Sequence, residues 1–214
     1  MPHRNIIRHY TEDASYHCYN RGVEKRKIFL DEQDYGVFLQ RLKLMLANPE
    51  GLDKEDVAGR VRVKSFYGEV QLISYCLMPN HFHLLLRQES ADAIPEFMRT
   101  LSTSYTMYFN KRYDRVGSLF QGRYKARLVD SDPYRLHISR YIHLNPLDLV
   151  SRLNLDAYLY SSMRFLREPD LAPSWLGAQE LLDDFGGSYQ KYKKFVYEYA
   201  APDMLEALDE EYSL

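Results

Sequence analysis

The 214-residue chain is 45% hydrophobic and carries a formal net charge of −2, which is typical of one globular domain of ordinary size with an elaboration. No apolar run approaches the roughly 20 residues needed to cross a bilayer, and no secretory signal pattern is present. We therefore exclude a membrane span and expect a cytoplasmic protein. The two cysteines, Cys18 and Cys76, lack a CxxC pattern and provide neither a disulfide framework nor a zinc knuckle.

The small net charge conceals a strong segregation of charge along the sequence. Residues 99–127 contain seven basic side chains and one acid, whereas residues 201–214 contain five acids and no base. Such a split allows a basic face to meet a polyanion while the rest of the surface stays acidic. A nucleic-acid partner is therefore compatible with the composition.

Hydrophobic periodicity and turn residues predict an ordered series of elements through the first two thirds of the chain. Asp31 is a candidate N-cap, Met78-Pro79-Asn80 is a candidate turn, and Asp132-Pro133 is a candidate N-cap and first-turn pair. The predicted elements are strand 15–20, helix 31–46, a surface connection over 51–64, strand 69–77, strand 81–87, helix 94–113, a strand that ends near Val129, and a helix that ends at Asn145-Pro146.

The order strand, helix, strand, strand, helix, strand, helix predicts an α+β fold. It is the ferredoxin-like split βαββαβ arrangement, an antiparallel sheet with helices packed on it. We predict a domain over residues 1–150 and a C-terminal helical accessory region over 151–214 that packs on it. Candidate helices in that region cover 158–166, 178–185 and 189–199, with a break at Gly186-Gly187.

Two histidines stand one residue apart in the stretch MPNHFHLLL, at the start of an apolar strand. Since strand side chains alternate between faces, His81 and His83 share one face and Phe82 points to the other, toward the core. Two imidazoles on a rigid strand suit a divalent metal. The alternative is a pair of half-exposed histidines bonded to neighbouring groups.

The last helix of the predicted domain offers a third ligand and a reactive group. Tyr141 and Asn145 are four residues apart and share one helical face. Two imidazoles and one amide oxygen suit Mg²⁺ or Mn²⁺, and an adjacent cation stabilises the phenolate form of a tyrosine nucleophile. The alternatives are an ordinary core tyrosine and an ordinary helix stop before proline.

Four segments in this order match a known family. MPNHFHLLL resembles the histidine-apolar-histidine (HUH) motif of the single-tyrosine HUH transposases. YIHLNP at residues 141–146 resembles the YIxxNP segment of their REP-associated tyrosine transposase (RAYT) branch, as do YHCYNRG at 16–22 and GSLFQGRYK at 117–125. The resemblance covers roughly residues 16–162.

The resemblance implies that His81, His83 and Asn145 bind Mg²⁺ or Mn²⁺ and that Tyr141 is the nucleophile. Similar enzymes cleave and rejoin single-stranded DNA beside a REP-like hairpin through a 5′-phosphotyrosine link, which conserves bond energy so that no nucleotide cofactor is required. Larger transposases of the wider family commonly have glutamine where Asn145 stands. The shorter amide side chain of Asn145 agrees with the REP-associated branch. Either a monomer or a homodimer is compatible with the resemblance.

The basic segment then acquires a role in DNA binding. Phosphate contacts give salt-dependent affinity, and aromatic rings stack on unpaired bases. The candidates for phosphate contact are Arg112, Arg115, Arg123, Lys125 and Arg127, and those for stacking are Phe120 and Tyr124. Arg4, Arg8 and Arg21 are candidates for reading a short sequence beside the hairpin. The alternative assigns the aromatic residues to the core and the charges to a solvated face.

Two other functions remain open on the sequence. The same basic and aromatic segment would serve a regulator that binds structured DNA or RNA without cutting it. A replication initiator or relaxase of the HUH class is a further alternative, but no helicase domain is evident and the YIxxNP context fits the transposase branch better.

Overall fold

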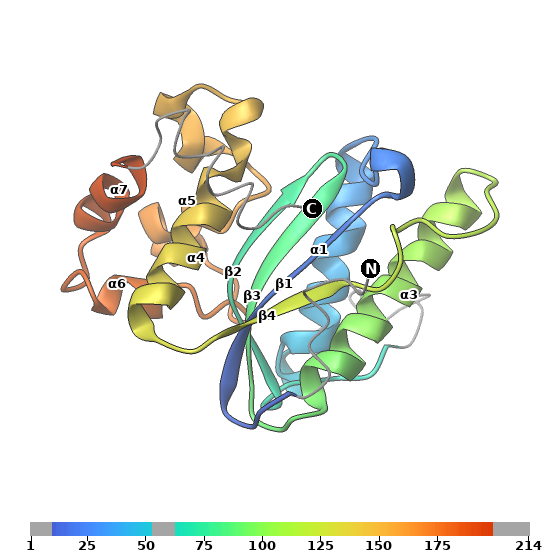
Figure 1. Cartoon of the computed structure of the whole chain (residues 1–214), viewed down its shortest axis with the longest axis horizontal. Helices are drawn as coiled ribbons and strands as arrows, with labels where there is room; N and C mark the ends of the chain where they lie inside the picture. Colours follow the sequence, from blue (N-terminus) through green and yellow to red (C-terminus); the bar gives the residue numbers. More distant parts are fainter. Residues whose placement is uncertain (1–9, 53–62, 199–214) are drawn as a thin grey trace, which may run out of the picture.

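The computed structural model describes residues 10–52 and 63–198, which form a four-stranded antiparallel sheet with helices on both faces (Figure 1). The strands are β1 (Ala14–Arg21), β2 (Val70–Met78), β3 (His81–Gln88) and β4 (Lys125–Val129). Their order in the sheet is β2-β3-β1-β4, and every neighbouring pair is antiparallel. This is the predicted split βαββαβ sheet.

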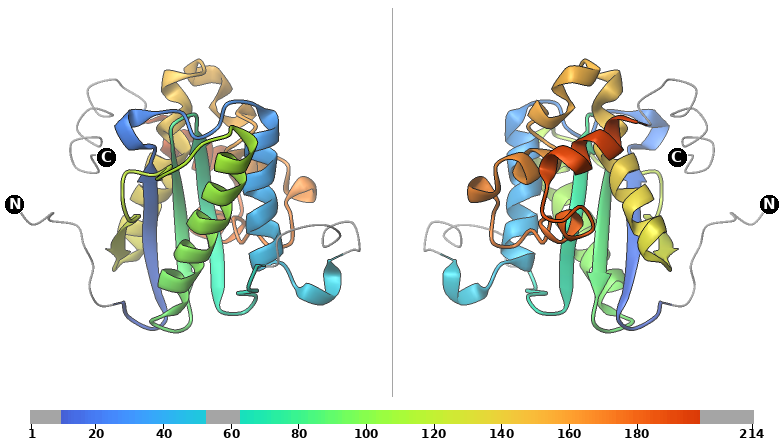
Figure 2. Two further views of the ribbon diagram at one scale, coloured as in Figure 1. Left: turned by 90° about the vertical axis from the view of Figure 1, so that its right-hand side faces the viewer. Right: turned by 90° about the vertical axis from the view of Figure 1, so that its left-hand side faces the viewer.

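Helices cover the two faces of the sheet as two separate layers (Figure 2). The first layer contains α1 (Glu32–Leu46) and α3 (Ala93–Arg112), which connect consecutive strands. The second contains α4 (Asp132–Leu144) and the C-terminal segments, which follow β4. The sheet is therefore covered on both sides, and most side chains of its central strands β3 and β1 are buried.

The first layer contains most of the large aromatic core. Phe82 of β3 packs against Phe38 of α1, with ring centroids 5.2 Å apart, and Phe38 packs against Tyr105 of α3 at 5.1 Å. All three side chains are fully buried. The apolar positions of β3 that alternate with the two histidines thus attach the strand to this layer.

Local sequence explains how the ends of the elements are fixed. The Asp31 carboxylate accepts a hydrogen bond from the Asp34 backbone N–H and caps α1, as predicted. Gly22 follows β1 at a close approach, since a Cβ there would lie 2.2 Å from the Arg26 carbonyl oxygen. In the β2–β3 turn, the Pro79 carbonyl oxygen accepts hydrogen bonds from the backbone N–H groups of Ile28 and Phe29.

The C-terminal segments differ in part from the predicted helices. Segments α5 (Met163–Arg167) and α6 (Glu180–Asp183) are single turns, and α7 (Tyr189–Tyr197) is a regular helix. Residues 158–162 are not helical because they lie along the edge of β2, where the Leu77 N–H donates to the Tyr160 carbonyl and the Ser162 N–H donates to the Tyr75 carbonyl. Short 3₁₀ turns occupy Val23–Lys25, Pro49–Gly51, Asn145–Asp148, Arg152–Ala157 and Pro169–Leu171.

Two other sequence predictions need comment. The N-cap position of α4 is Ser131, one residue earlier than the predicted Asp132, so that Pro133 lies in the first helical turn. Most of the connection predicted over 51–64 lies outside the described residues.

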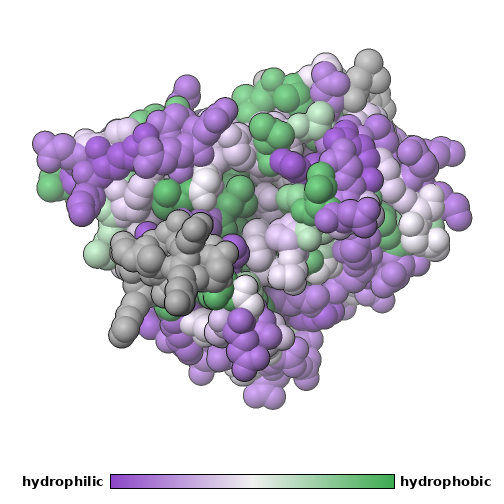
Figure 3. Space-filling model, turned by 180° about the vertical axis from the view of Figure 1, so that it is seen from behind, coloured by the Kyte–Doolittle hydropathy of each residue, from purple (hydrophilic) through white to green (hydrophobic). Residues whose placement is uncertain are grey.

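The surface behind the view of Figure 1 is largely hydrophilic, with smaller hydrophobic patches (Figure 3). Within residues 10–52 and 63–198, every helix is too short or too polar to span a membrane.

Candidate active site

The histidine pair lies on the face of the sheet that α4 covers. His81 begins β3 opposite Met78 of β2, and His83 lies two residues on, with the two ring centroids 5.1 Å apart. His81 is partly exposed, whereas His83 is fully buried. The alternative of a half-exposed pair is therefore wrong for His83, because α4 packs over this part of β3.

Neighbouring amides orient the His81 ring. The Asn80 amide nitrogen donates to the Lys25 carbonyl, so the Asn80 amide oxygen faces His81 Nδ1 at 2.7 Å and accepts its proton. In neutral His81 this leaves Nε2 as a lone-pair donor. Nε2 lies 3.0 Å from the amide oxygen of Asn145, whose nitrogen donates to the Tyr141 carbonyl at 2.9 Å.

His83 is oriented by a third histidine. His17 of β1 places Nε2 2.9 Å from His83 Nδ1, and the rings stack at a centroid distance of 5.1 Å. Burial and the neighbouring charges of His81 and His17 hold the pKa of His83 well below its usual value, so the ring is neutral at physiological pH. Among the described residues, His83 Nε2 is buried with no hydrogen-bond partner.

Tyr141 lies between α4 and the sheet, beside the same imidazoles. Its ring centroid is 5.3 Å from that of His83 and 5.8 Å from that of His17, in edge-to-face arrangements. The side chain is 3% exposed. Tyr141 and Asn145 stand one helical turn apart, so the turn that ends α4 brings both toward the start of β3.

The side chains fit a divalent cation. His81 Nε2 and the Asn145 amide oxygen are two acceptors that face each other, and His83 Nε2 is buried without a proton donor in the described residues. A cation would satisfy all three lone pairs, whereas burial of an unpaired polar atom is costly. Among the described residues, no three histidine, cysteine, aspartate or glutamate side chains are placed to hold a metal ion together, so a metal site here needs the Asn145 amide as a ligand.

Three predicted DNA-binding residues share this face. The β1–β3 register pairs Arg21 with His81, and the β1–β4 register pairs Tyr19 with Lys125 and His17 with Arg127. Since paired residues point to the same side of a sheet, the three basic residues lie beside the imidazoles. Arg21 also donates two hydrogen bonds to the Gln121 side chain, which fixes the loop before β4 next to His81.

Other predicted DNA-binding residues lie elsewhere. Arg112 forms ion pairs with Asp31 at 2.6 Å and with the buried Asp34 at 2.8 Å, and thereby joins α3 to α1. Arg115, just after α3, donates a hydrogen bond to the side chain of Asn110 on that helix. Phe120 is buried against Phe82, which makes it a core residue and removes it as a platform for a base.

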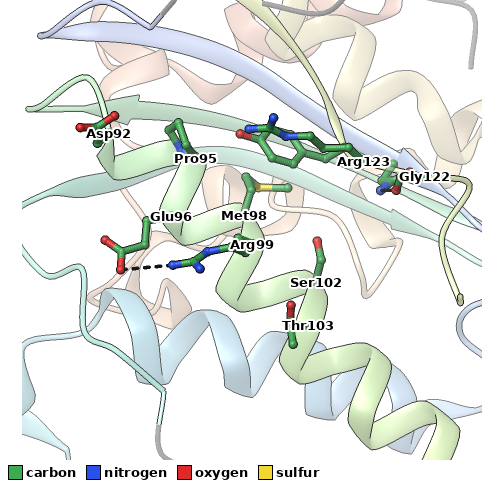
Figure 4. A pocket seen from close by; sticks show the side chains of 11 residues that line it. Asp92, Pro95, Glu96, Met98, Arg99, Ser102, Thr103, Gly122 and Arg123 are labelled. Atoms are coloured by element: carbon green, nitrogen blue, oxygen red, sulfur yellow. Dashed lines mark hydrogen bonds and ion pairs between the residues drawn. The ribbon is translucent and has the colours of Figure 1, made fainter. Parts of the chain in front are cut away.

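Arg123 and Tyr124 lie on the α3 side of the sheet, where they border a groove of about 620 Å³ (Figure 4). The Arg123 guanidinium lies over the Tyr124 ring, whose hydroxyl contacts that of Tyr10 at 2.8 Å. The rest of the lining consists of Asn20, Asp92, Gly122 and the α3 residues Pro95, Glu96, Met98, Arg99, Ser102 and Thr103. The groove is thus separated by the sheet from the histidine pair. Arg4 and Arg8 lie outside the described residues.

Sequence reasoning missed two residues that orient the ligands, His17 and Asn80. His17 stands on a predicted strand, but its contact with His83 depends on the β1–β3 register, which is a long-range property. Asn80 was recognised only as a turn residue. The position of Asn80 directly before His81 indicates its orienting role, because from there its side chain can hydrogen-bond the His81 imidazole.

Comparison with known proteins finds a matching family model. Residues 52–145 match the family model described as "Transposase IS200 like". These residues are thus similar to an IS200-like transposase domain, and the match supports a transposase-like, DNA-binding function. The matched segment contains His81, His83, Tyr141 and Asn145. A search of curated proteins finds no match.

One solved structure shares the fold at low sequence identity. A REP-associated tyrosine transposase, whose structure was solved bound to a REP hairpin, superposes with a TM-score of 0.57 at 14% identity, over 78% of this chain and 87% of that one. At this identity the likeness establishes a common fold. A transposase homologue from Deinococcus radiodurans R1 aligns with a TM-score of 0.39 at 21% identity, over 64% of this chain and 94% of that one.

Proposed function

We propose that the protein is a metal-dependent tyrosine transesterase that cleaves and rejoins single-stranded DNA beside a REP-like hairpin. The observation that carries the proposal is the meeting of His81, His83 and Asn145 with the Tyr141 ring within one chain. All these groups come from two elements, β3 and the end of α4, so a partner subunit is not needed to bring them together.

In this proposal His81 Nε2, His83 Nε2 and the Asn145 amide oxygen hold Mg²⁺ or Mn²⁺. Neutral imidazoles and a neutral amide leave most of the cation's charge for the substrate. The bound cation supplies Lewis-acid polarisation of the scissile phosphate. Asn80 and His17 fix the ring orientations and thereby keep the ligating nitrogens aimed at one point.

Tyr141 is the proposed nucleophile. Its phenolic oxygen forms a bond to the phosphorus, and the bond from phosphorus to the 3′ oxygen breaks. The proton lost by the phenol is balanced by the proton gained by the released 3′-hydroxyl. The product is a 5′-phosphotyrosine link. A 3′-hydroxyl later attacks the phosphorus of this link and releases the tyrosine. Each step exchanges one phosphoester bond for another, so the bond energy is conserved and no nucleotide cofactor is needed.

The DNA backbone is proposed to lie along the stripe formed by Arg21, Lys125 and Arg127, because these residues share the face of the imidazoles. Phosphate contacts there would position the scissile bond and make binding sensitive to salt. Arg123 and Tyr124, at the groove on the other face, are left as contacts for an unpaired flanking nucleotide.

A hairpin oligonucleotide with single-stranded flanks and a 3′ label tests the function. With Mn²⁺ the protein should form a covalent, denaturation-resistant adduct that carries the label. Tyr141→Phe should form none, and Tyr134→Phe on the first turn of α4 is the matched control that should retain it. An adduct of undiminished yield from Tyr141→Phe would overturn the assignment of the nucleophile.

A second candidate is a hairpin-binding regulator that does not cleave. The burial of Tyr141 at 3% exposure favours it, since a nucleophile must reach its substrate. Hairpin binding by the wild-type protein without any adduct, unchanged in His81→Ala, would support this regulator over the transesterase.

A further inference from the structure

A second set of buried side chains, distinct from those of the candidate active site, connects helix α4 to α7 and to the segment before α5. His143 lies between Tyr141 and Asn145 in the sequence, but its ring contacts Tyr192 of α7 and Ser162, which precedes α5. His143, Tyr192 and Ser162 are each fully buried. The last turn of α4 is therefore fixed on two sides.

The contacts form one continuous chain of hydrogen bonds with a consistent direction. The Tyr75 backbone N–H of β2 donates to Ser162 Oγ at 2.9 Å, and the Ser162 hydroxyl donates to His143 Nε2 at 2.8 Å. His143 Nδ1–H then donates to the Tyr192 hydroxyl at 2.6 Å, which donates to Ser139 Oγ of α4 at 3.1 Å.

The Tyr75 carbonyl, 3.2 Å from Ser162 Oγ, is a second acceptor for the Ser162 hydroxyl. When that hydroxyl donates to the nearer His143 Nε2, the roles of the remaining atoms in the chain are compatible. Ser139 Oγ donates in turn to the Leu136 carbonyl at 2.9 Å, so the chain ends on the backbone of the helix it holds. Every donor has an acceptor, and His143 carries one proton, at Nδ1. Fully satisfied buried polar networks specify a single arrangement, because any rotation of the helix would leave several groups unpaired at once.

Further contacts tie α4 to the same C-terminal segments. Arg135 pairs with Asp184, just after α6, at 2.8 Å, and the Arg140 guanidinium lies 4.3 Å from the centroid of the Phe195 ring of α7. The hydrogen-bond chain differs from these contacts because it runs through His143, which lies between Tyr141 and Asn145 in the sequence.

We propose that His143, Tyr192 and Ser162 are positioning residues that lock the rotation of α4 between β2 and α7, and so hold Tyr141 and Asn145 against His81 and His83. The inference rests on the proposed transesterase function for its kinetic consequence only. It makes the C-terminal segments a part of the machinery of the site, because they supply two of the three residues. Misplacement of a reacting group by about 1 Å can cost on the order of 100-fold in rate.

Tyr192→Phe is the sharpest test, since it removes one hydroxyl from the chain and keeps the ring. Tyr105→Phe is its matched control: Tyr105 is also fully buried, its hydroxyl also makes a 2.6 Å hydrogen bond, to the Ile28 carbonyl, and it lies on the opposite face of the sheet. Ser162→Ala interrupts the chain from the other end and replaces Tyr192→Phe if that variant does not fold.

Two readouts are measured well below the unfolding midpoints of both variants. The first is the single-turnover rate of adduct formation at saturating hairpin, together with the hairpin Kd. The second is the ¹⁹F resonance of 3-fluorotyrosine placed at residue 141 alone, in metal-free protein without DNA. Tyr192→Phe should slow the adduct at least about 10-fold at unchanged Kd and shift or broaden the resonance, whereas Tyr105→Phe should alter neither.

A Tyr192→Phe rate equal to that of the control overturns the proposal, even where the resonance moves. If the wild-type protein forms no adduct, the transesterase function has failed, and the fluorine resonance alone decides the positioning role. In that case an unshifted signal in Tyr192→Phe overturns it.

Discussion

The two faces of the sheet are built from different chemistry, although the same strands supply both. The α1/α3 face is a packed aromatic core in which Phe82 contacts Phe38 and Phe120. The α4 face carries imidazoles, phenols and hydroxyls at corresponding positions, among them His81 and His83. Because side chains alternate along β3, Phe82 packs into the core on one face while His81 and His83 project from the other. The residues that stabilise the strand are therefore different from those of the candidate site.

Of the changes that test this comparison of the two faces, removal of the metal proposed to bind on the α4 face should have the largest effect. Treatment with EDTA should abolish the DNA adduct, and Mn²⁺ should restore it, because the three proposed ligands are neutral and the cation they hold would supply the charge that polarises the phosphate. His81→Ala removes a proposed ligand outright. Its adduct yield should therefore fall by more than the roughly 10- to 100-fold that follows the loss of a residue that only hydrogen-bonds a metal ligand. Adduct yield on denaturing gels measures both, and full activity in EDTA would contradict the metal site.

Phe82→Ala should affect stability more than any single change on the α4 face of β3. Loss of a fully buried phenylalanine typically costs about 3–5 kcal/mol, and Phe82 contacts rings from α1 and from the segment before β4. Arg87→Ala is the control on the opposite face of the same strand. Arg87 is 45% exposed and its ion pair with Glu180 is at the surface, so the expected cost is about 1 kcal/mol or less. Urea unfolding followed by circular dichroism measures both, and equal costs would contradict the division.

Asn80→Ala should have an intermediate effect. It removes the acceptor for the His81 Nδ1 proton, so the ring loses its fixed tautomer. We expect Mn²⁺ affinity of the DNA-free protein to fall about 10- to 100-fold with little change in folding. Electron paramagnetic resonance of free Mn²⁺ measures the affinity, and Asn48→Ala, which removes a different loop cap, is the control. Equal Mn²⁺ affinities in the two variants would show that Asn80 does not orient the ligand.

The smallest effect is expected from Lys125→Ala. If Lys125 contacts one phosphate, the slope of log K against log salt should fall by roughly 0.7–0.9. Arg112→Ala should leave that slope unchanged and lower stability instead, because it removes an ion-pair partner of the buried Asp34. Fluorescence anisotropy at several salt concentrations distinguishes them, and a reduced slope in Arg112→Ala would restore that residue as a DNA contact.

The sequence was sufficient for what depends on local pattern. The alternation in residues 81–87, the Asp31 cap and the four-residue spacing of Tyr141 and Asn145 predicted the sheet, the first helix and a shared helical face, and each is present. The family match over residues 52–145 and the shared fold confirm the resemblance to the REP-associated branch of these transposases. The roles assigned to the site residues stay predictions.

What the sequence could not supply depends on long-range packing. Arg112 has the charge of a DNA contact, but only the position of Asp34 on another helix shows that it is an ion-pair partner. The sequence favours Phe120 as a stacking residue, but in the fold its ring packs against Phe82 of β3. Likewise, residues 158–162 have helical spacing, yet the unpaired edge of β2 competes for their backbone groups.

That edge pairing also bears on how the molecule can be divided. Without residues 158–162 and the Gly177 N–H, which donates to the Leu72 carbonyl, much of β2 would present open backbone groups to solvent. An exposed apolar edge strand is a template for intermolecular sheet growth. A fragment that ends near residue 150 would therefore be expected to aggregate, and any shortened form of this transposase-like protein should retain the chain through α7.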